Sequence, residues 1–189
     1  MKLTSQLEEY VPYDEQEGKD KNMILSFINE HPDAFLRENE IGHMTASCFI
    51  VNEEMTKALL CFHKIYNSWS WLGGHADGDE DLLNVAMKEA KEESGLKNIR
   101  PYDGKIFSLE TLCVNGHFKK GKYVSSHLHL NVTYLLVASE TEKLKIKEDE
   151  NSGLAWFGLD KVCSASSEPW FVKFIYPKLI EKVRMLKQG

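Results

Sequence analysis

The stretch WLGGHADGDEDLLNVAMKEAKEESGL, from Trp71 to Leu96, decides how the rest of the chain is read. Glu89, Glu92 and Glu93 follow one another at helical spacing, so a helix places their carboxylates within an arc of about 100°. Like charges at this spacing destabilise a helix. A divalent cation would offset their repulsion, because Mg²⁺ takes oxygen ligands and often bridges one or two carboxylates to substrate phosphates.

The residues around these glutamates predict one amphipathic helix over about residues 80–94. Its apolar stripe consists of Leu83, Ala86, Met87 and Ala90. Gly95 follows at the position where glycine commonly ends a helix. Acidic residues crowd the amino-terminal end, where the helix dipole favours negative charge, and Glu80 is expected to support the helix start rather than a metal.

Two interpretations of the glutamates remain open on the residues alone. In the first, Gly73-Gly74 brings a backbone carbonyl close to a bound cation, because glycine lets the backbone approach a ligand. In the second, the glutamates form a solvated helix face that Lys88 and Lys91 partner.

Hydrophobic patterning outside this stretch predicts an α/β fold with a mixed sheet and helices on both faces. The expected strands are Ala46–Val51, Lys57–His63, Ile106–Val114, His127–Ala138 and Leu154–Leu159. The lysines at 119, 120 and 122 are expected in a loop. Residues 1–42 are predicted as a helical extension, with a second short helix starting at Pro32, and residues 43–189 as the main domain. A carboxy-terminal helix should be kinked or divided at Pro177.

Composition excludes several classes of protein. The chain has 189 residues, 42% hydrophobic content and a net charge of −6, so no stable nucleic-acid complex is expected. There is no apolar run of about 18 residues, which predicts no membrane span, and no signal-peptide pattern at the start. Four cysteines without a C-x-x-C pair fit reduced thiols and a cytoplasmic protein.

The stretch resembles the Nudix box, G-x5-E-x7-R-E-U-x-E-E-x-G-U, where U is a bulky aliphatic residue. Seven of the nine fixed positions match, at Gly74, Glu80, Glu89, Glu92, Glu93, Gly95 and Leu96. The segments starting at Gly42, Trp71 and His127 are also similar to one bacterial Nudix subgroup. Lys88 replaces the usual arginine and Ala90 the usual aliphatic residue, so a working but slower site is expected.

The resemblance implies a Nudix-type α/β/α sandwich and hydrolysis of a diphosphate linkage in a nucleoside diphosphate derivative or similar small molecule, with Mg²⁺ or Mn²⁺. It implies Glu89, Glu93 and the Gly73 carbonyl as metal ligands, with Glu92 binding metal or deprotonating water, and a catalytic contribution from Lys88. Related enzymes often add a late acid, for which the candidates are Glu148, Asp149 and Glu150.

Other residues are weaker candidates for substrate binding. His127 and His129 share one strand face, which suits a metal, a polar wall of the substrate cleft, or two partly exposed histidines. Trp71 could stack on a base or pack in the core. His75 and His117 are expected to be loop residues rather than ligands. The two terminal regions are expected to shape the pocket or a homodimer contact.

Two further functions compete with hydrolysis. An isomerase similar to isopentenyl diphosphate isomerase would need an acid and a cysteine, Cys61 or Cys113, on opposite sides of the substrate. Cys61 alternates within an apolar strand like a core residue. A non-catalytic sensor would bind a nucleotide-like ligand, but regulators of that kind tend to lose the box glutamates, which this chain keeps.

Overall fold

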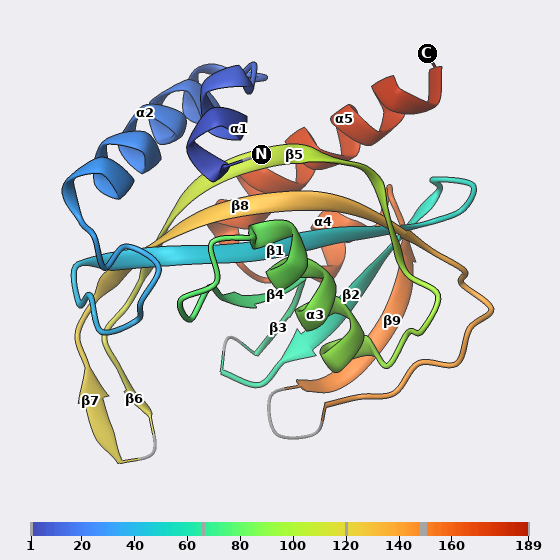
Figure 1. Cartoon of the computed structure of the whole chain (residues 1–189). Coiled ribbons are helices and arrows are strands. Elements are labelled where there is room, and N and C mark those ends of the chain that lie inside the picture. The colour runs from blue at the N-terminus through green and yellow to red at the C-terminus, as the bar shows by residue number, and fades with distance from the viewer. Residues whose placement is uncertain (1, 66, 120, 148–150, 189) are drawn as a thin grey trace. The chain divides into compact units, whose positions relative to one another are not determined.

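The computed structural model describes residues 2–65, 67–119, 121–147 and 151–188, and Figure 1 labels its elements. The chain forms two compact units, each assembled from three segments. Unit 1 consists of Met1–Ser47, Gly73–Ala86 and Gly104–Tyr134, and unit 2 of Cys48–Leu72, Met87–Asp103 and Leu135–Gly189. These units do not follow the predicted boundary between residues 42 and 43, which stays a prediction.

The described residues form one seven-stranded sheet in the order β3-β2-β1-β8-β5, with β4 paired to β1 and β9 paired to β2. The strands are β1 Gly42–Asn52, β2 Lys57–His63, β3 Ser68–Ser70, β4 Leu72–His75, β5 Arg100–Val114, β8 His127–Ala138 and β9 Asn151–Gly158. The predicted bounds of β2 and β8 are confirmed. β1, β5 and β9 begin earlier than predicted, because the residues added at their starts do not form a continuous apolar run.

Helix α3 (Leu82–Ser94) is amphipathic as predicted, but its buried side consists of Leu82, Val85, Ala86 and Ala90, while Leu83 and Met87 are half-buried. It begins two residues later than predicted, because the Asp81 carboxylate accepts a hydrogen bond from the Asn84 amide at 3.1 Å and so occupies the capping position. Gly95 ends the helix with φ +71°, and its N–H donates to the Lys91 carbonyl at 2.9 Å. A Cβ at Gly95 would lie 2.6 Å from the Lys145 Cβ, so the glycine is also needed for packing.

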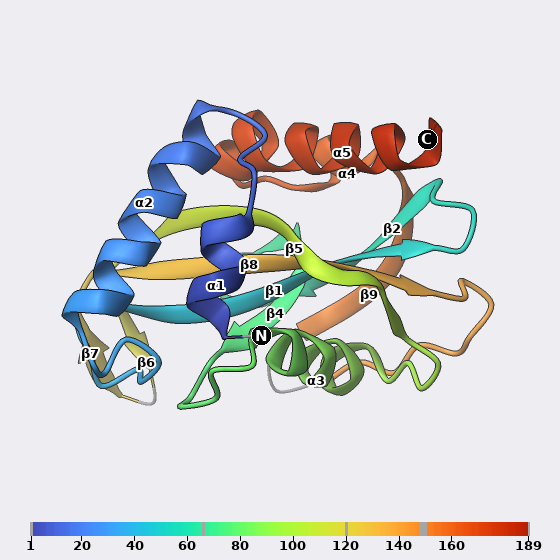
Figure 2. The same ribbon diagram turned by 45° about the horizontal axis from the view of Figure 1, so that its top comes forward.

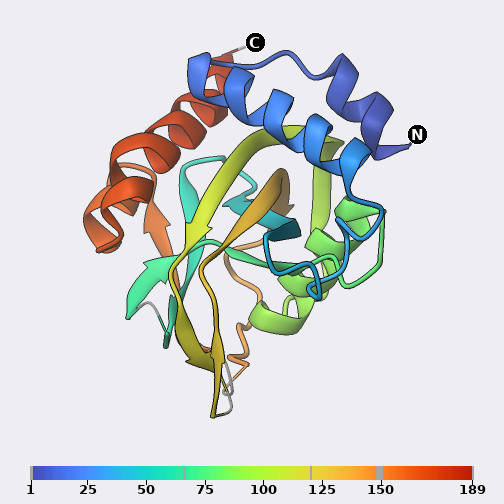
Figure 3. The same ribbon diagram turned by 90° about the vertical axis from the view of Figure 1, so that its left-hand side faces the viewer.

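Two amino-terminal helices, α1 (Leu3–Glu9) and α2 (Glu15–Glu30), lie side by side against β5 in unit 1 (Figures 2 and 3). The Asp14 side chain caps α2. Gln16 Nε2 donates to the Leu109 carbonyl at 3.0 Å, and the Thr111 amide donates to Asp20 Oδ2 at 3.0 Å. The helical extension is therefore fastened to the sheet by polar contacts with the backbone of one strand.

Glu17 is a fully buried carboxylate at the centre of this attachment. Its Oε2 accepts from the Tyr10 hydroxyl at 2.5 Å and the Tyr13 amide at 2.7 Å, and its Oε1 lies 2.7 Å from the Ser108 hydroxyl, which it shares with Glu110. Burial, followed by the charge of Glu17, raises the pKa of Tyr10, so the phenol stays a donor. These contacts thus satisfy a charge that would otherwise be costly to bury.

Two segments differ from the sequence prediction. The short helix expected from Pro32 is absent, and residues 32–35 form turns instead. The Ala34 carbonyl accepts a hydrogen bond from the Met44 amide of β1 at 2.7 Å. This carbonyl is therefore bonded to the strand rather than to an amide of a helix. The expected lysine loop contains a hairpin of β6 (His117–Lys119) and β7 (Lys122–Val124), which follows β5 and precedes β8 (Figure 3).

The end of unit 2 is helical, with α4 (Val162–Ala165), a π-helical turn (Phe171–Ile175) and α5 (Tyr176–Gln188). The predicted disturbance at Pro177 is confirmed: the Tyr176 amide reaches five residues back to the Phe171 carbonyl. Proline lacks an N–H and its ring crowds the preceding turn, which favours this wider turn. No described helix combines the length and apolar character that a membrane span requires.

We expect Glu17→Gln to lower the free energy of unfolding by about 2–3 kcal/mol, because an amide NH₂ would face donors that now bond to a carboxylate. Chemical denaturation measures this loss. Glu15→Gln is the matched control, since Glu15 is exposed in the same first turn of α2 and its loss should cost less than about 1 kcal/mol. Equal losses in the two variants would contradict the role given to Glu17.

Candidate active site

Helix α3 presents the three box glutamates in unit 2 in graded exposure. Glu93 is buried, with 4% of its surface exposed, Glu89 is half-buried and Glu92 is exposed. The three glutamates differ in exposure because they lie at different angles around the helix axis. Glu93 lies on the same side as Ala86 and Ala90, which is the buried side. Burying a carboxylate is unfavourable unless it is paired, hydrogen-bonded or bound to a metal.

Asn151, the first residue of β9, holds Glu93 in place. Its Nδ2 donates to Glu93 Oε1 at 3.1 Å, and Asn151 itself is only 1% exposed. The pairing of β9 with β2 fixes Asn151, which lies opposite His63. The Asn151 Oδ1 is buried and has no hydrogen-bond partner among the described residues. An unpaired amide oxygen beside a buried carboxylate is suited to a hard cation.

A thiol lies close to the same carboxylates. Cys48 is fully buried, and its Sγ donates to the Leu72 carbonyl at 3.3 Å. Burial, then the charges of Glu93 and Glu89, raise the pKa of the Cys48 thiol, so it stays protonated and adds no further negative charge. Sequence reasoning missed both Cys48 and Asn151. The only signal for Asn151 was its position directly after the acidic residues 148–150.

The exposed side of the helix carries the remaining box residues. Glu92 has 45% of its side chain exposed, and its Oε2 lies 3.9 Å from Lys147 Nζ, which is a weak, solvent-screened contact. Lys88 is exposed. The three candidates for the late acid, at positions 148, 149 and 150, lie outside the described residues.

Gly73 lies in β4, within unit 1, where no other residue fits. Its φ is +159°, and a Cβ would lie 2.5 Å from the Ala46 carbonyl oxygen and 2.7 Å from the Ser47 Cα. The close approach of β4 to β1 therefore excludes any side chain. This explains the glycine in packing terms, while its role as a carbonyl ligand stays a prediction.

Unit 1 contains a cluster of four histidines. His43 in β1, His75 in β4 and His127 and His129 in β8 have ring centroids 4.9–5.1 Å apart in five of their pairings. Burial, then the neighbouring His75, lower the pKa of His129 to about 2, and burial lowers the pKa of His43. The predicted shared face of His127 and His129 is present, whereas His75 ends a strand rather than lying in a loop. His43 was not predicted.

One aromatic candidate, Trp71, and one thiol candidate, Cys61, lie in the core of unit 2. Trp71 is 8% exposed and packs edge-to-face against Phe171 and Tyr176 at centroid distances of 5.2 and 6.3 Å. Cys61 is 1% exposed, and its Sγ lies 3.5 Å from the Trp71 carbonyl oxygen. These surroundings fit packing residues, and contact of Trp71 with a substrate stays a prediction.

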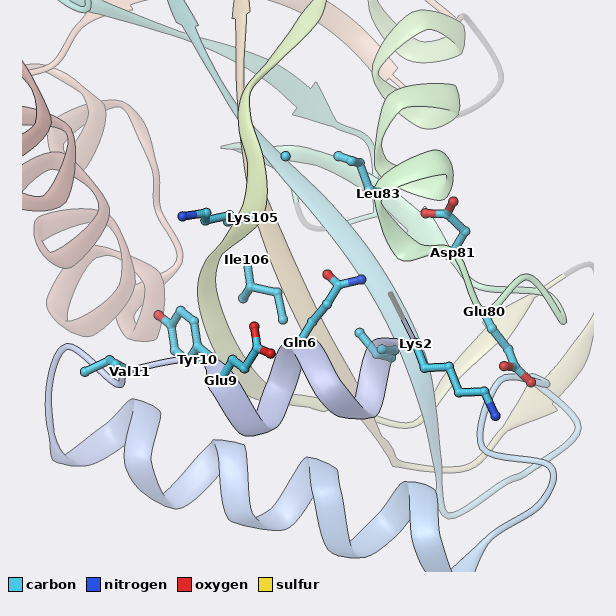
Figure 4. A pocket seen from close by; sticks show the side chains of 12 residues that line it. Lys2, Gln6, Glu9, Tyr10, Val11, Glu80, Asp81, Leu83, Lys105 and Ile106 are labelled. Atoms are coloured by element: carbon cyan, nitrogen blue, oxygen red, sulfur yellow. The ribbon is translucent and has the colours of Figure 1, made fainter.

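A pocket of about 710 Å³ in unit 1 involves none of the predicted site residues (Figure 4). It lies among α1, the start of α3 and β5. Its charged lining consists of Lys2, Lys105, Glu9, Glu80 and Asp81. Because carboxylates outnumber lysines there, the lining does not favour a diphosphate.

Comparisons with known proteins show the family of the chain. The NUDIX domain family matches residues 42–180, which is most of the chain. The chain belongs to the Nudix family. It is also similar to the RNA pyrophosphohydrolase of Pelagibacter ubique (strain HTCC1062), with 28% identity over 121 residues, covering 62% of this chain and 75% of the relative. The protein is thus a Nudix hydrolase.

Solved structures confirm the fold. A NUDIX-family hydrolase from Clostridium perfringens has a TM-score of 0.55 and 24% identity, covering 76% of this chain and 97% of that one. A C. elegans Ap4A hydrolase has a TM-score of 0.54 and 19% identity, covering 77% and 98%. An E. coli dihydroneopterin triphosphate pyrophosphohydrolase has a TM-score of 0.52 and 12% identity, covering 73% and 94%. The predicted mixed sheet with helices and an amino-terminal helical part is confirmed.

We expect Asn151→Ala to lower the free energy of unfolding of the metal-free protein by about 1–3 kcal/mol, because the buried Glu93 carboxylate loses a donor. Thermal and chemical unfolding in the presence of a chelator measure the loss. Asn98→Ala is the matched control, since Asn98 also donates to a glutamate, Glu142, but is exposed. A loss no larger than in this control would show that Asn151 does not stabilise Glu93.

Proposed function

We propose that the protein uses a divalent cation, Mg²⁺ or Mn²⁺, to hydrolyse the diphosphate linkage of a nucleoside diphosphate derivative or a similar small molecule. The observation that carries the proposal is the buried Glu93 carboxylate beside the Asn151 Oδ1, which accepts no hydrogen bond from any described residue. Glu89 adds a second carboxylate one helical turn earlier. The donor set is rich in oxygen and poor in nitrogen and sulfur, which fits Mg²⁺ or Mn²⁺.

Glu89, Glu92 and Glu93 would hold the cation, and by position in the motif Gly73 would add its backbone carbonyl. The cation would stabilise the negative charge that develops on the phosphoryl oxygens and would activate the attacking water. The buried Glu93 is the fixed ligand, because the Asn151 amide sets the orientation of its carboxylate.

Glu92 is suited to move the proton. Its carboxylate is the exposed one of the three, and its contact with Lys147 at 3.9 Å is loose enough to leave oxygen lone pairs available. It can therefore accept the proton of the attacking water. Glu93 is less suited to this step, since one of its oxygens already accepts from Asn151.

The first test is release of phosphate or nucleotide from a substrate panel with Mg²⁺ and with Mn²⁺. The panel contains nucleotide sugars, dinucleoside polyphosphates, oxidised nucleoside triphosphates and a triphosphate-ended RNA. We expect metal-dependent release that falls by roughly 10²–10⁴-fold in Glu92→Gln, because the variant keeps the shape but loses the base.

Glu181→Gln is the control for that test. Glu181 is exposed on α5 and pairs with Arg184, so its loss should leave turnover unchanged. Release of equal rate in Glu92→Gln and wild type would contradict the assignment of Glu92. Binding of panel compounds without turnover in either metal would favour the sensor, and conversion without phosphate release would favour the isomerase.

The lysine at the box arginine position gives a second test. Arginine can grip a carboxylate with two parallel hydrogen bonds, whereas lysine offers only a point charge. We expect Lys88→Arg to raise kcat by roughly fivefold, equivalent to about 1 kcal/mol of better orientation.

Lys91→Arg is the matched control, because Lys91 is exposed on the same helix but occupies a variable position of the box. Steady-state kinetics on the substrate found above compare the two variants. If the kcat of Lys88→Arg does not exceed that of Lys91→Arg, the native lysine at position 88 does not limit the rate of hydrolysis.

A further inference from the structure

We propose that His43, His75 and His129 form a second metal site, which takes a nitrogen-preferring transition ion such as Zn²⁺ and is separate in chemistry from the carboxylates of the Nudix box. One ring nitrogen from each histidine lies within 4.8 Å of the others. The three residues come from β1, β4 and β8, three strands that place these histidines in the same unit.

The separations are close to those of a bound ion. Zn–N distances of about 2.0–2.1 Å in a tetrahedral site place ligand nitrogens roughly 3.3 Å apart. The imidazoles therefore need to close by about 1.5 Å at most, which small side-chain rotations can supply. His75 and His129 are half-buried, so the cluster retains access for an ion.

The hydrogen bond of His43 shows which of its nitrogens is ready to bind. Its Nδ1 lies 3.2 Å from the Asn39 carbonyl oxygen, and a carbonyl can only accept, so Nδ1 carries the hydrogen. The Nε2 then presents a lone pair. That atom is buried in a residue only 4% exposed and has no hydrogen-bond partner among the described residues. Burying such an acceptor unpaired is costly, and a cation would satisfy it.

His127 extends the same arrangement. Its Nδ1 donates to the Ser125 carbonyl at 2.8 Å, so its Nε2 is an acceptor, and this atom faces His129 Nε2 at 3.2 Å. A histidine that donates one N–H to a backbone carbonyl and turns the other nitrogen inward has the orientation typical of metal ligands. His127 is therefore placed to become a fourth ligand or to orient His129.

The donor set decides the class of ligand. Lone pairs on neutral imidazoles repel a phosphate, which needs N–H donors, and attract a cation. The three-histidine group contains no carboxylate, and imidazole suits Zn²⁺, Cu²⁺ or Ni²⁺ rather than Mg²⁺. Such an ion would join β1, β4 and β8, and through His75 it would anchor the strand that contains Gly73.

The test is titration of the full chain with Co²⁺, a coloured substitute for Zn²⁺, in excess Mg²⁺ and in a Cys113→Ser background that removes the exposed thiol. We expect one Co²⁺ per chain, with visible absorption of a nitrogen-bound ion that Zn²⁺ displaces. His75→Gln and His129→Gln should each weaken binding by about 100-fold or more. Zn²⁺ at 100 times its Kd should raise the Tm of the parent by roughly 5–10 °C and leave these variants unchanged.

Two control variants distinguish the histidine site from metal binding elsewhere on the chain. His31→Gln removes a histidine at the end of α2 and should leave binding intact. Glu92→Gln should keep the Co²⁺ site while losing hydrolysis, so the failure of one proposal is distinguishable from failure of the other. Circular dichroism of the metal-free variants confirms folding.

Unchanged Co²⁺ affinity in His129→Gln, or no saturable binding by the parent chain, would overturn the proposal. Loss of the Co²⁺ site in Glu92→Gln alone would also overturn it, because the ion would then lie on the box glutamates.

Discussion

Burial of the Glu93 carboxylate is the constraint on which the proposed chemistry depends. A carboxylate with 4% of its surface exposed needs compensation, and the Asn151 amide, which donates to it at 3.1 Å, sets its orientation. The neighbouring Cys48 is protonated, so it neither adds a charge nor neutralises one. The arrangement therefore suits a cation, and it fixes one ligand rigidly while Glu92 stays in solvent.

Two buried carboxylates of the chain, Glu17 and Glu93, are stabilised in different ways. Glu17 accepts from a phenol and a backbone amide and contacts a serine hydroxyl, so donors of the chain itself satisfy it. Glu93 accepts from the amide of Asn151, whose own oxygen lacks a partner among the described residues. A buried carboxylate that accepts several hydrogen bonds from the chain stabilises the fold. A buried carboxylate beside an amide oxygen without a hydrogen-bond partner is suited to bind an ion.

The sequence predicted what depends on periodicity and spacing. Helix α3 was predictable because its apolar stripe and its box glutamates repeat at the helical period, and β2 and β8 because their apolar runs end at polar turns. The turns after Pro32 were not predictable from the sequence, because the Met44 amide that donates to the Ala34 carbonyl lies ten residues away. Asn151 and His43 were missed for the same reason. Each acts through a partner distant in the sequence or on another strand, and no local pattern marks it.

The two proposed metal sites would allow one chain to sort metal ions by donor type. Carboxylates on α3 present hard oxygen donors, which suit an ion that keeps part of its water and exchanges it for substrate phosphates. Imidazoles on β1, β4 and β8 present neutral nitrogen donors, which such an ion binds poorly. A cell supplies far more Mg²⁺ than free transition ions, so abundance favours Mg²⁺ at oxygen sites. Selectivity for a second ion therefore has to come from the donor atoms, and the paired carbonyl contacts of His43 and His127 fix those atoms before any ion arrives.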